Sequence, residues 1–108
     1  MSIAWIYLIL AILLEVAGTT CMKFSDGFTK ILPSVMMFIL YGGSFVALTY
    51  AVKTIDISVA YAVWAAVGIT LIAIIGILYF KEPVTALKVV SIGLIVIGVA
   101  GLYLSGTH

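Results

Sequence analysis

Residues 57–80 read ISVAYAVWAAVGITLIAIIGILYF, an uninterrupted stretch without a charged side chain. About 20 helical residues suffice to cross the roughly 30 Å hydrocarbon layer of a bilayer, so this stretch is long enough to span a membrane. Its apolar residues are continuous, whereas a barrel strand of about ten residues alternates between apolar and polar positions. Because a helix pairs its own backbone groups in lipid, residues 57–80 are predicted to form a transmembrane helix.

Three similar stretches accompany this one. Of the 108 residues, 66% are hydrophobic and 8% are charged, whereas soluble domains are about half apolar and about a quarter charged. The joints between the stretches are short and polar, and Pro33 and Pro83 lie near helix starts, where a missing N–H costs little. We predict an all-α integral membrane protein with one domain, residues 1–108, made of four transmembrane helices at about 3–22, 31–52, 57–80 and 85–104.

The composition excludes several other classes of protein. Cys21 is the only cysteine, which leaves no intramolecular disulfide and no CxxC metal pair. The formal net charge of +1 provides no basic patch for nucleic acid. These two observations exclude a cysteine metal pair and a nucleic-acid partner. We also predict no metal, no cofactor and no enzymatic activity.

The lysines indicate an orientation. The side of a membrane protein that is richer in Lys and Arg usually stays cytoplasmic. Here Lys53 lies in the second joint, whereas the first and third joints carry Lys23, Lys30, Lys81 and Lys88. The first and third joints are therefore expected in the cytoplasm, although the excess is small and insertion in both directions is an open alternative.

Glu15 lies near the middle of the first predicted helix, between Leu14 and Val16. An acid in the centre of a membrane helix costs about 2.5 to 3.5 kcal/mol on insertion scales, and intramembrane ionisable residues usually serve a function. No Lys or Arg lies inside a predicted span to neutralise it, so its counter-charge is expected to be mobile: a proton, a bound cation, or each in turn. The alternative is a protonated glutamate that hydrogen-bonds across helices as a structural group.

Aromatic side chains lie at the same depth. Side chains three or four residues apart share one face of a helix, and aromatic belts normally lie at the membrane interfaces. Tyr61 and Trp64 instead fall several residues inside the third predicted helix. Because aromatic rings attract organic cations through their faces, these rings indicate a cation site. Ala65 and Gly68 share the face of Tyr61 and Trp64 on the third helix. The other residues on such faces are Leu8, Ala11, Ile12, Gly18 and Thr19 around Glu15, and Tyr41, Ser44 and Phe45 on the second helix.

Four helices form a thin bundle that can hardly surround a solute pathway, so self-association or pairing with a similar chain is expected. Small residues spaced three or four apart let helix backbones approach closely in lipid. The last predicted helix carries small residues at Ser91, Gly93, Gly98 and Gly101, of which Gly98 and Gly101 are three apart. We predict that Ser91, Gly93 and Gly98 form the dimer interface.

Several motifs together match one family. The stretch EVAGTTCMKFSDGFTK at residues 15–30, then Pro33-Ser34, AYAVW at residues 60–64 and Val67-Gly68, resemble the small multidrug resistance family of proton-coupled exporters. The resemblance covers essentially the whole chain in length, order and helix count. It implies a multi-pass protein of the inner (plasma) membrane that forms an antiparallel dimer, in which two copies of Glu15 face one pocket and alternating access exchanges protons for an organic cation.

By position, Glu15 looks like the family's essential acid, and the protons it binds are the implied coupling ions. The resemblance implies that the pocket is lined by Leu8, Ala11, Ile12, Gly18, Thr19, Tyr41, Ser44, Phe45, Tyr61 and Trp64.

The family has two main subtypes. One exports quaternary ammonium and other lipophilic cations, and the other exports guanidinium. Gly18-Thr19 and Tyr41 look like the first subtype, since guanidinium exporters typically carry Trp where Gly18 stands. The segment FKEPVTAL at residues 80–87 resembles the third loop of the guanidinium subtype. We expect the pocket residues to decide specificity, and hence a quaternary ammonium exporter. The alternatives are a guanidinium exporter, one subunit of a paired heterodimeric exporter, and a scaffold that transports nothing.

Overall fold

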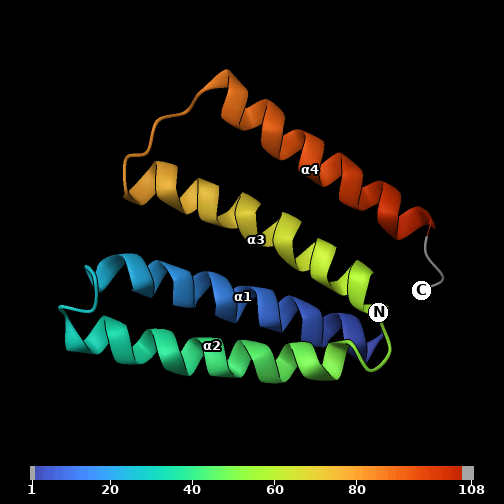
Figure 1. Cartoon of the computed structure of the whole chain (residues 1–108), viewed down its shortest axis with the longest axis horizontal. Coiled ribbons are helices and arrows are strands. Elements are labelled where there is room, and N and C mark those ends of the chain that lie inside the picture. Colours follow the sequence, from blue (N-terminus) through green and yellow to red (C-terminus); the bar gives the residue numbers. More distant parts are fainter. Residues whose placement is uncertain (1, 106–108) are drawn as a thin grey trace.

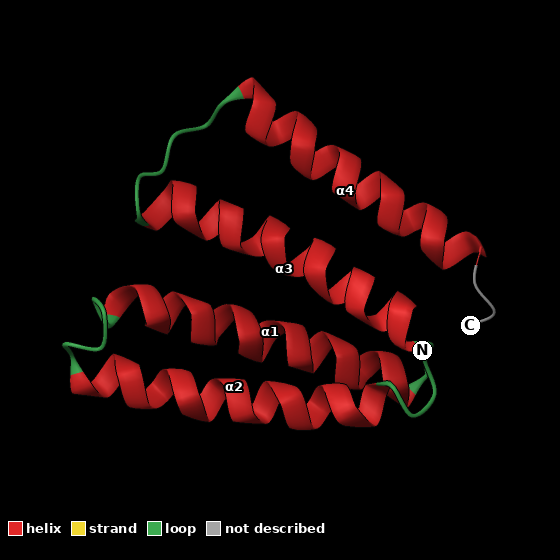
Figure 2. Cartoon of the chain, viewed as in Figure 1, coloured by secondary structure: helices red, strands yellow, loops and turns green. Residues whose placement is uncertain are grey.

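The computed structural model describes residues 2–105, which form four helices (Figure 2). They are α1 (Ile3–Phe24), α2 (Ile31–Ala51), α3 (Ile57–Tyr79) and α4 (Ala86–Ser105), and no strand lies within the described residues. All four are long and apolar enough to cross a membrane, which confirms the predicted all-α membrane fold. Each observed helix end falls within two residues of the predicted one. Residues 1 and 106–108 of the predicted domain lie outside the described part of the chain.

The end of α1 shows why its bound differs from the prediction. The Ser25 N–H donates to the Cys21 carbonyl at 2.9 Å, so the last helical turn closes beyond residue 22. The next two residues, Asp26 and Gly27, have φ angles of 50° and 67°. A left-handed backbone cannot continue a right-handed helix, and the chain therefore turns back toward α2.

The four helices lie side by side in the order α2, α1, α3, α4 (Figure 1). The chain measures 44 × 35 × 19 Å along its principal axes, and in the view along the shortest axis the four helices lie beside one another (Figure 1). The helices thus form a single layer. α1 is held on both flanks, because it packs extensively on α2 and also contacts α3.

The core of the layer lies along α1. Leu8 has no exposed surface, Ile12 is buried, and both belong to one apolar cluster with Ala51, Val59 and Ala60. The cluster therefore joins α1 to the end of α2 and the start of α3. This packing holds the helix that carries Glu15 in place.

α4 packs mainly on α3, meets α1 through the edge-to-face pair of Tyr103 and Trp5, and has no buried residue. Beyond its chain neighbours and the backbone of its own helix, a Cβ placed on Gly93 or Gly98 would meet no atom of residues 2–105 within 4 Å, and Ser91 is exposed. The small residues of the predicted dimer interface are thus uncovered. Their pairing with a second chain stays a prediction.

Candidate functional site

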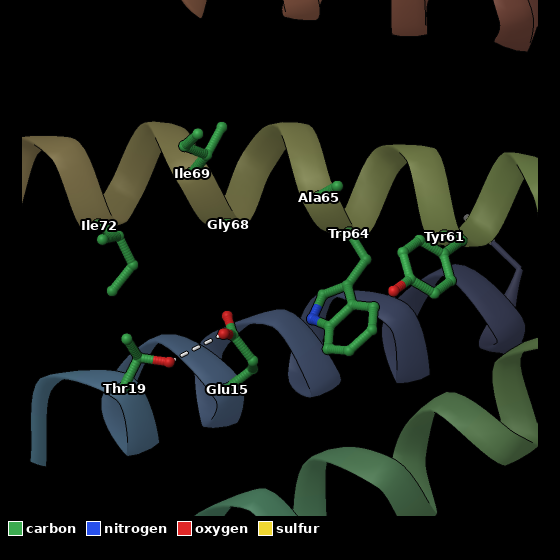
Figure 3. Close-up of a pocket in the computed structure, with 8 residues that line it drawn as sticks. All are labelled: Glu15, Thr19, Tyr61, Trp64, Ala65, Gly68, Ile69 and Ile72. Atoms are coloured by element: carbon green, nitrogen blue, oxygen red, sulfur yellow. Dashed lines mark hydrogen bonds between the residues drawn. The ribbon is translucent and has the colours of Figure 1, made fainter. Parts of the chain in front are cut away.

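Glu15 lies in the middle of α1, and its half-buried side chain points toward α3 (Figure 3). The chain has five basic and four acidic residues. Glu15 alone among them lies in the interior of a helix, since the others lie in connections or in the first or last turn of a helix. Within residues 2–105, the one ion pair joins Lys88 and Glu82. The Glu15 carboxylate therefore has no fixed positive partner in the described chain.

Hydroxyl groups take the place of such a partner. The Thr19 hydroxyl, one turn along α1, donates to Glu15 Oε1 at 2.9 Å. The hydroxyl oxygen of Thr19 also lies 2.7 Å from the hydroxyl oxygen of Tyr41 in α2. A threonine hydroxyl has one proton, which is given to Glu15, so Tyr41 is the donor to Thr19. The chain Tyr41 to Thr19 to Glu15 thus directs both protons toward the carboxylate and fixes the orientation of its side chain.

A cavity of about 320 Å³ opens between α1 and α3 beside this carboxylate (Figure 3). Its volume falls at the lower end of the range for small-molecule sites, about 300–1,000 Å³. A Cβ placed on Gly68 would lie 3.4 Å from Glu15 Oε2, so the glycine leaves space next to the acid. The cavity is lined by Glu15, Thr19, Tyr61, Trp64, Ala65, Gly68, Ile69 and Ile72.

Aromatic rings form one wall of the site. Tyr61 and Trp64 make an edge-to-face pair with centroids 5.3 Å apart, and Phe45 of α2 meets Trp64 in the same manner at 6.1 Å. Tyr61 and Trp64 also line a second cavity of about 400 Å³, which Phe45 borders from α2. The two cavities therefore meet at the Trp64 indole.

Trp64 carries an unused donor. Its Nε1 is buried without a hydrogen-bond partner, and Figure 3 shows this nitrogen on the side of the ring that faces Glu15. A buried donor left unpaired costs about 1–3 kcal/mol. An acceptor that enters the cavity would relieve this cost.

The structure brings together five of the predicted site residues and places a sixth beside them. Glu15, Thr19, Tyr61 and Trp64 line the first cavity, and Phe45 lines the second. Tyr41 reaches the acid through Thr19.

The other five predicted residues line neither of these two cavities. They are all buried, and the Ser44 hydroxyl donates to the Ala11 carbonyl at 2.7 Å, which joins α2 to α1. Their role in substrate binding stays a prediction, and their position here is in helix packing. These residues are Leu8, Ala11, Ile12, Gly18 and Ser44.

Sequence reasoning placed Ala65 and Gly68 on the Tyr61 face but did not extend that face to Ile69 and Ile72. A signal for both was present, because Ile69 lies four residues after Ala65 and Ile72 four residues after Gly68. Their apolar side chains give the cavity a mixed character, with one acid and two hydroxyl groups among hydrocarbon and rings.

These features define a multi-pass membrane protein with one acid near the middle of a span, beside an aromatic-lined cavity. The profile described as Small Multidrug Resistance protein matches residues 3–95, and the chain belongs to this family. Members are transporters of small organic cations rather than enzymes, and they are multi-pass proteins of the plasma membrane.

Individual relatives agree with this assignment. The chain is 56% identical to an uncharacterized membrane protein, YvaE of Bacillus subtilis (strain 168), over 93% of this chain and 84% of that protein. It is 40% identical to a multidrug resistance protein, mmr of Mycolicibacterium paratuberculosis (strain ATCC BAA-968 / K-10), over 96% and 98% of the two chains. It is also 39% identical to a quaternary ammonium compound-resistance protein, QacG of Staphylococcus sp. (strain ST94), over 94% and 95%.

Proposed function

We propose that this chain exports quaternary ammonium and other lipophilic organic cations across the plasma membrane in exchange for protons. The observation that carries the proposal is the Glu15 carboxylate, which has no fixed cation in the described chain and borders a cavity lined by two aromatic rings. A proton and an organic cation are alternative partners for such a group. Because each excludes the other, binding of one releases the other.

The quaternary ammonium class is supported by two observations. Aromatic rings bind quaternary ammonium groups through their faces, without a permanent negative charge, and Tyr61, Trp64 and Phe45 present three rings at the site. A relative with 39% identity is named for resistance to quaternary ammonium compounds. Guanidinium is the competing substrate, because the segment at residues 80–87 resembles the other subtype.

The proposal includes an antiparallel dimer with alternating access. A single layer leaves the cavity walls open, since Tyr61 and Phe45 are 59% and 55% exposed in one chain. A second copy would cover these rings and bring a second Glu15 to the pocket. The small residues of α4 that meet no neighbour in the chain would take part in its contact.

Transport by liposomes that contain this chain alone tests the proposal. With an acidic interior, the wild type is expected to accumulate a quaternary ammonium dye in proportion to the pH step and to release protons outward as it does so. Glu15→Gln keeps the size of the side chain but removes its charge, and is expected to reduce uptake to that of protein-free liposomes.

The matched control is Asp26→Asn, the same chemical change in an exposed connection. It is expected to transport at the wild-type rate. Proton-driven uptake that persists in Glu15→Gln would refute the proposal. Uptake of guanidinium in place of the dye would reassign the substrate, and activity that requires a homologous second chain would identify a paired exporter.

A further inference from the structure

The connections α1–α2 and α3–α4 lie at the same end of the layer (Figure 1), and side chains from the two helix ends meet there. The rings of Phe24 and Phe80 lie 5.1 Å apart between centroids. The Lys23 ammonium lies 5.9 Å from the centroid of the Phe80 ring, within the range of a cation–π interaction. A cation of the chain itself therefore already lies over Phe80.

Glu82 brings a carboxylate to the same place. Its N–H donates to the Gly76 carbonyl at 3.0 Å, and its side chain fills the space that Gly76 leaves, since a Cβ there would lie 2.7 Å from Glu82 Cδ. The Glu82 side chain is 47% exposed, and its ionic partner, the Lys88 ammonium, is 3.9 Å away. An exposed pair of this kind contributes little binding energy, so the carboxylate is available to another cation.

A small cavity of about 130 Å³ lies between these groups, with Lys23, Phe80 and Glu82 in its walls. It shares Thr19 and Ile72 with the cavity beside Glu15. The two spaces are thus neighbours along α1 and α3. A solute that moves from Glu15 toward this end of the layer meets Phe80 and Glu82 next.

We propose that Phe80 and Glu82 form a second, peripheral binding site for compact organic cations at this end of the Glu15 cavity, and that the Lys23 ammonium competes with the ligand for it. The site combines a carboxylate with an aromatic face, as the Glu15 site does. Its smaller volume admits a compact cation or the charged head of a larger one. The inference rests on the proposed function only for the class of ligand.

A titration with tetramethylammonium, monitored by NMR of the Phe80 ring, tests the site. The full-length chain is held in lipid nanodiscs at constant ionic strength, and all variants carry Glu15→Gln so that the central acid is silent. A saturable shift of the Phe80 signals is expected in this background. Adding Lys23→Gln is expected to tighten binding by about two- to fivefold, the change that corresponds to a cation–π contact of roughly 0.5–1 kcal/mol.

Adding Glu82→Gln is expected to weaken binding by at least about twofold, since it removes the charge that faces the ligand. Gly76→Ala is a second variant that is expected to weaken binding. Its new methyl group displaces the flexible end of the Glu82 side chain but leaves the charge of the carboxylate unchanged. Asp26→Asn removes an acid from the same end of the layer and is expected to leave binding unchanged.

Two results would overturn the peripheral site: no saturable shift in the Glu15→Gln chain, or equal effects of Glu82→Gln and Asp26→Asn. Neither result bears on dye transport by the wild type, which tests the proposed function separately. Conversely, a peripheral site can be present in a chain whose Glu15 does not support exchange, and the titration would then still succeed.

Discussion

The Tyr41 ring lies against the backbone of Gly18, so closely that a Cβ at residue 18 would come within 2.6 Å of Tyr41 Cδ1 and 2.7 Å of Cε1. Only a residue without a side chain permits this approach. The contact brings the Tyr41 hydroxyl to 2.7 Å from Thr19, and hence into the hydrogen-bond chain that ends on Glu15. Gly18 thus acts on the acid through the position of a ring on another helix.

Gly18→Ala is expected to push the Tyr41 ring aside and break its hydrogen bond to Thr19. Loss of a bond worth about 0.5–1.5 kcal/mol predicts a decrease of about two- to tenfold in affinity for a quaternary ammonium dye, measured by equilibrium binding. Gly42→Ala is the control, since a Cβ there meets nothing within 4 Å. Tyr41→Phe should cause the same loss, and combining it with Gly18→Ala should add nothing further. Additive losses would show that Gly18 acts by another route.

Thr19→Val keeps the shape of the side chain but removes the hydroxyl that connects Tyr41 to Glu15. Because hydrogen bonds to a charged group contribute about 1.5–3 kcal/mol, cation affinity should fall by at least about tenfold while the chain still inserts and folds. Thr70→Val makes the same change at a hydroxyl that donates to its own helix, at Ala66, and should bind as the wild type does. Equal affinity in the two variants would exclude the hydrogen-bond chain from binding.

Trp64→Phe removes the unpaired Nε1–H and shrinks the ring while retaining an aromatic face. Thermal stability should not decrease through a lost hydrogen bond, because this donor has no partner among the described residues. Dye affinity should decrease by about two- to fivefold, since Trp is a better cation–π partner than Phe by a fraction of the roughly 0.5–2 kcal/mol involved. Trp5→Phe, at a ring that pairs with Tyr103, should leave affinity intact. A loss of stability together with unchanged affinity would assign Trp64 to packing.

Ser44→Ala is expected to affect stability and leave binding unchanged. Its hydroxyl is buried and donates to the Ala11 carbonyl, and such contacts between membrane helices contribute about 0.6 kcal/mol on average. Unfolding in mixed micelles should detect a loss of this size. Ser34→Ala, whose exposed hydroxyl donates to the carbonyl of Lys30 just before α2, should show none. A decrease in dye affinity beyond twofold in Ser44→Ala would restore its predicted role in the substrate site.

The fold could be predicted from the sequence because lipid imposes a simple requirement. A long uncharged stretch must satisfy its own backbone, and only a helix does so in a single segment. The predicted ends were displaced by at most two residues, as at Phe24, where Ser25 closes one more turn. Hydropathy does not predict such local hydrogen bonds at the ends of helices.

The site could be predicted in part. Tyr61, Trp64, Ala65 and Gly68 share one face of α3 by spacing, and all four line the cavity beside Glu15. On α1 the same spacing was ambiguous, because it covers a wide arc around Glu15 and does not tell which side meets α2. Thr19 is on the cavity side of that arc, whereas Ala11 packs against α2 through Ser44.

The contact between Gly76 and Glu82 could not be predicted. It depends on how the α3–α4 connection folds back on the helix that precedes it, with the Glu82 N–H bound to the Gly76 carbonyl. The spacing of residues predicts neighbours only within one helix. It does not predict a contact between a helix and a side chain of the connection that follows it. From the sequence alone, Glu82 is an acid in a polar connection, with no indication that it contacts Gly76.

A chain that is 19 Å deep meets its surroundings on two broad sides, so many of its side chains also serve as contact surface for acyl tails or a neighbouring molecule. A thick bundle absorbs an altered side chain by rearranging its own centre, whereas this layer passes the disturbance directly to whatever lies against it. How well this protein tolerates a substitution therefore depends on the lipid composition of the bilayer around it.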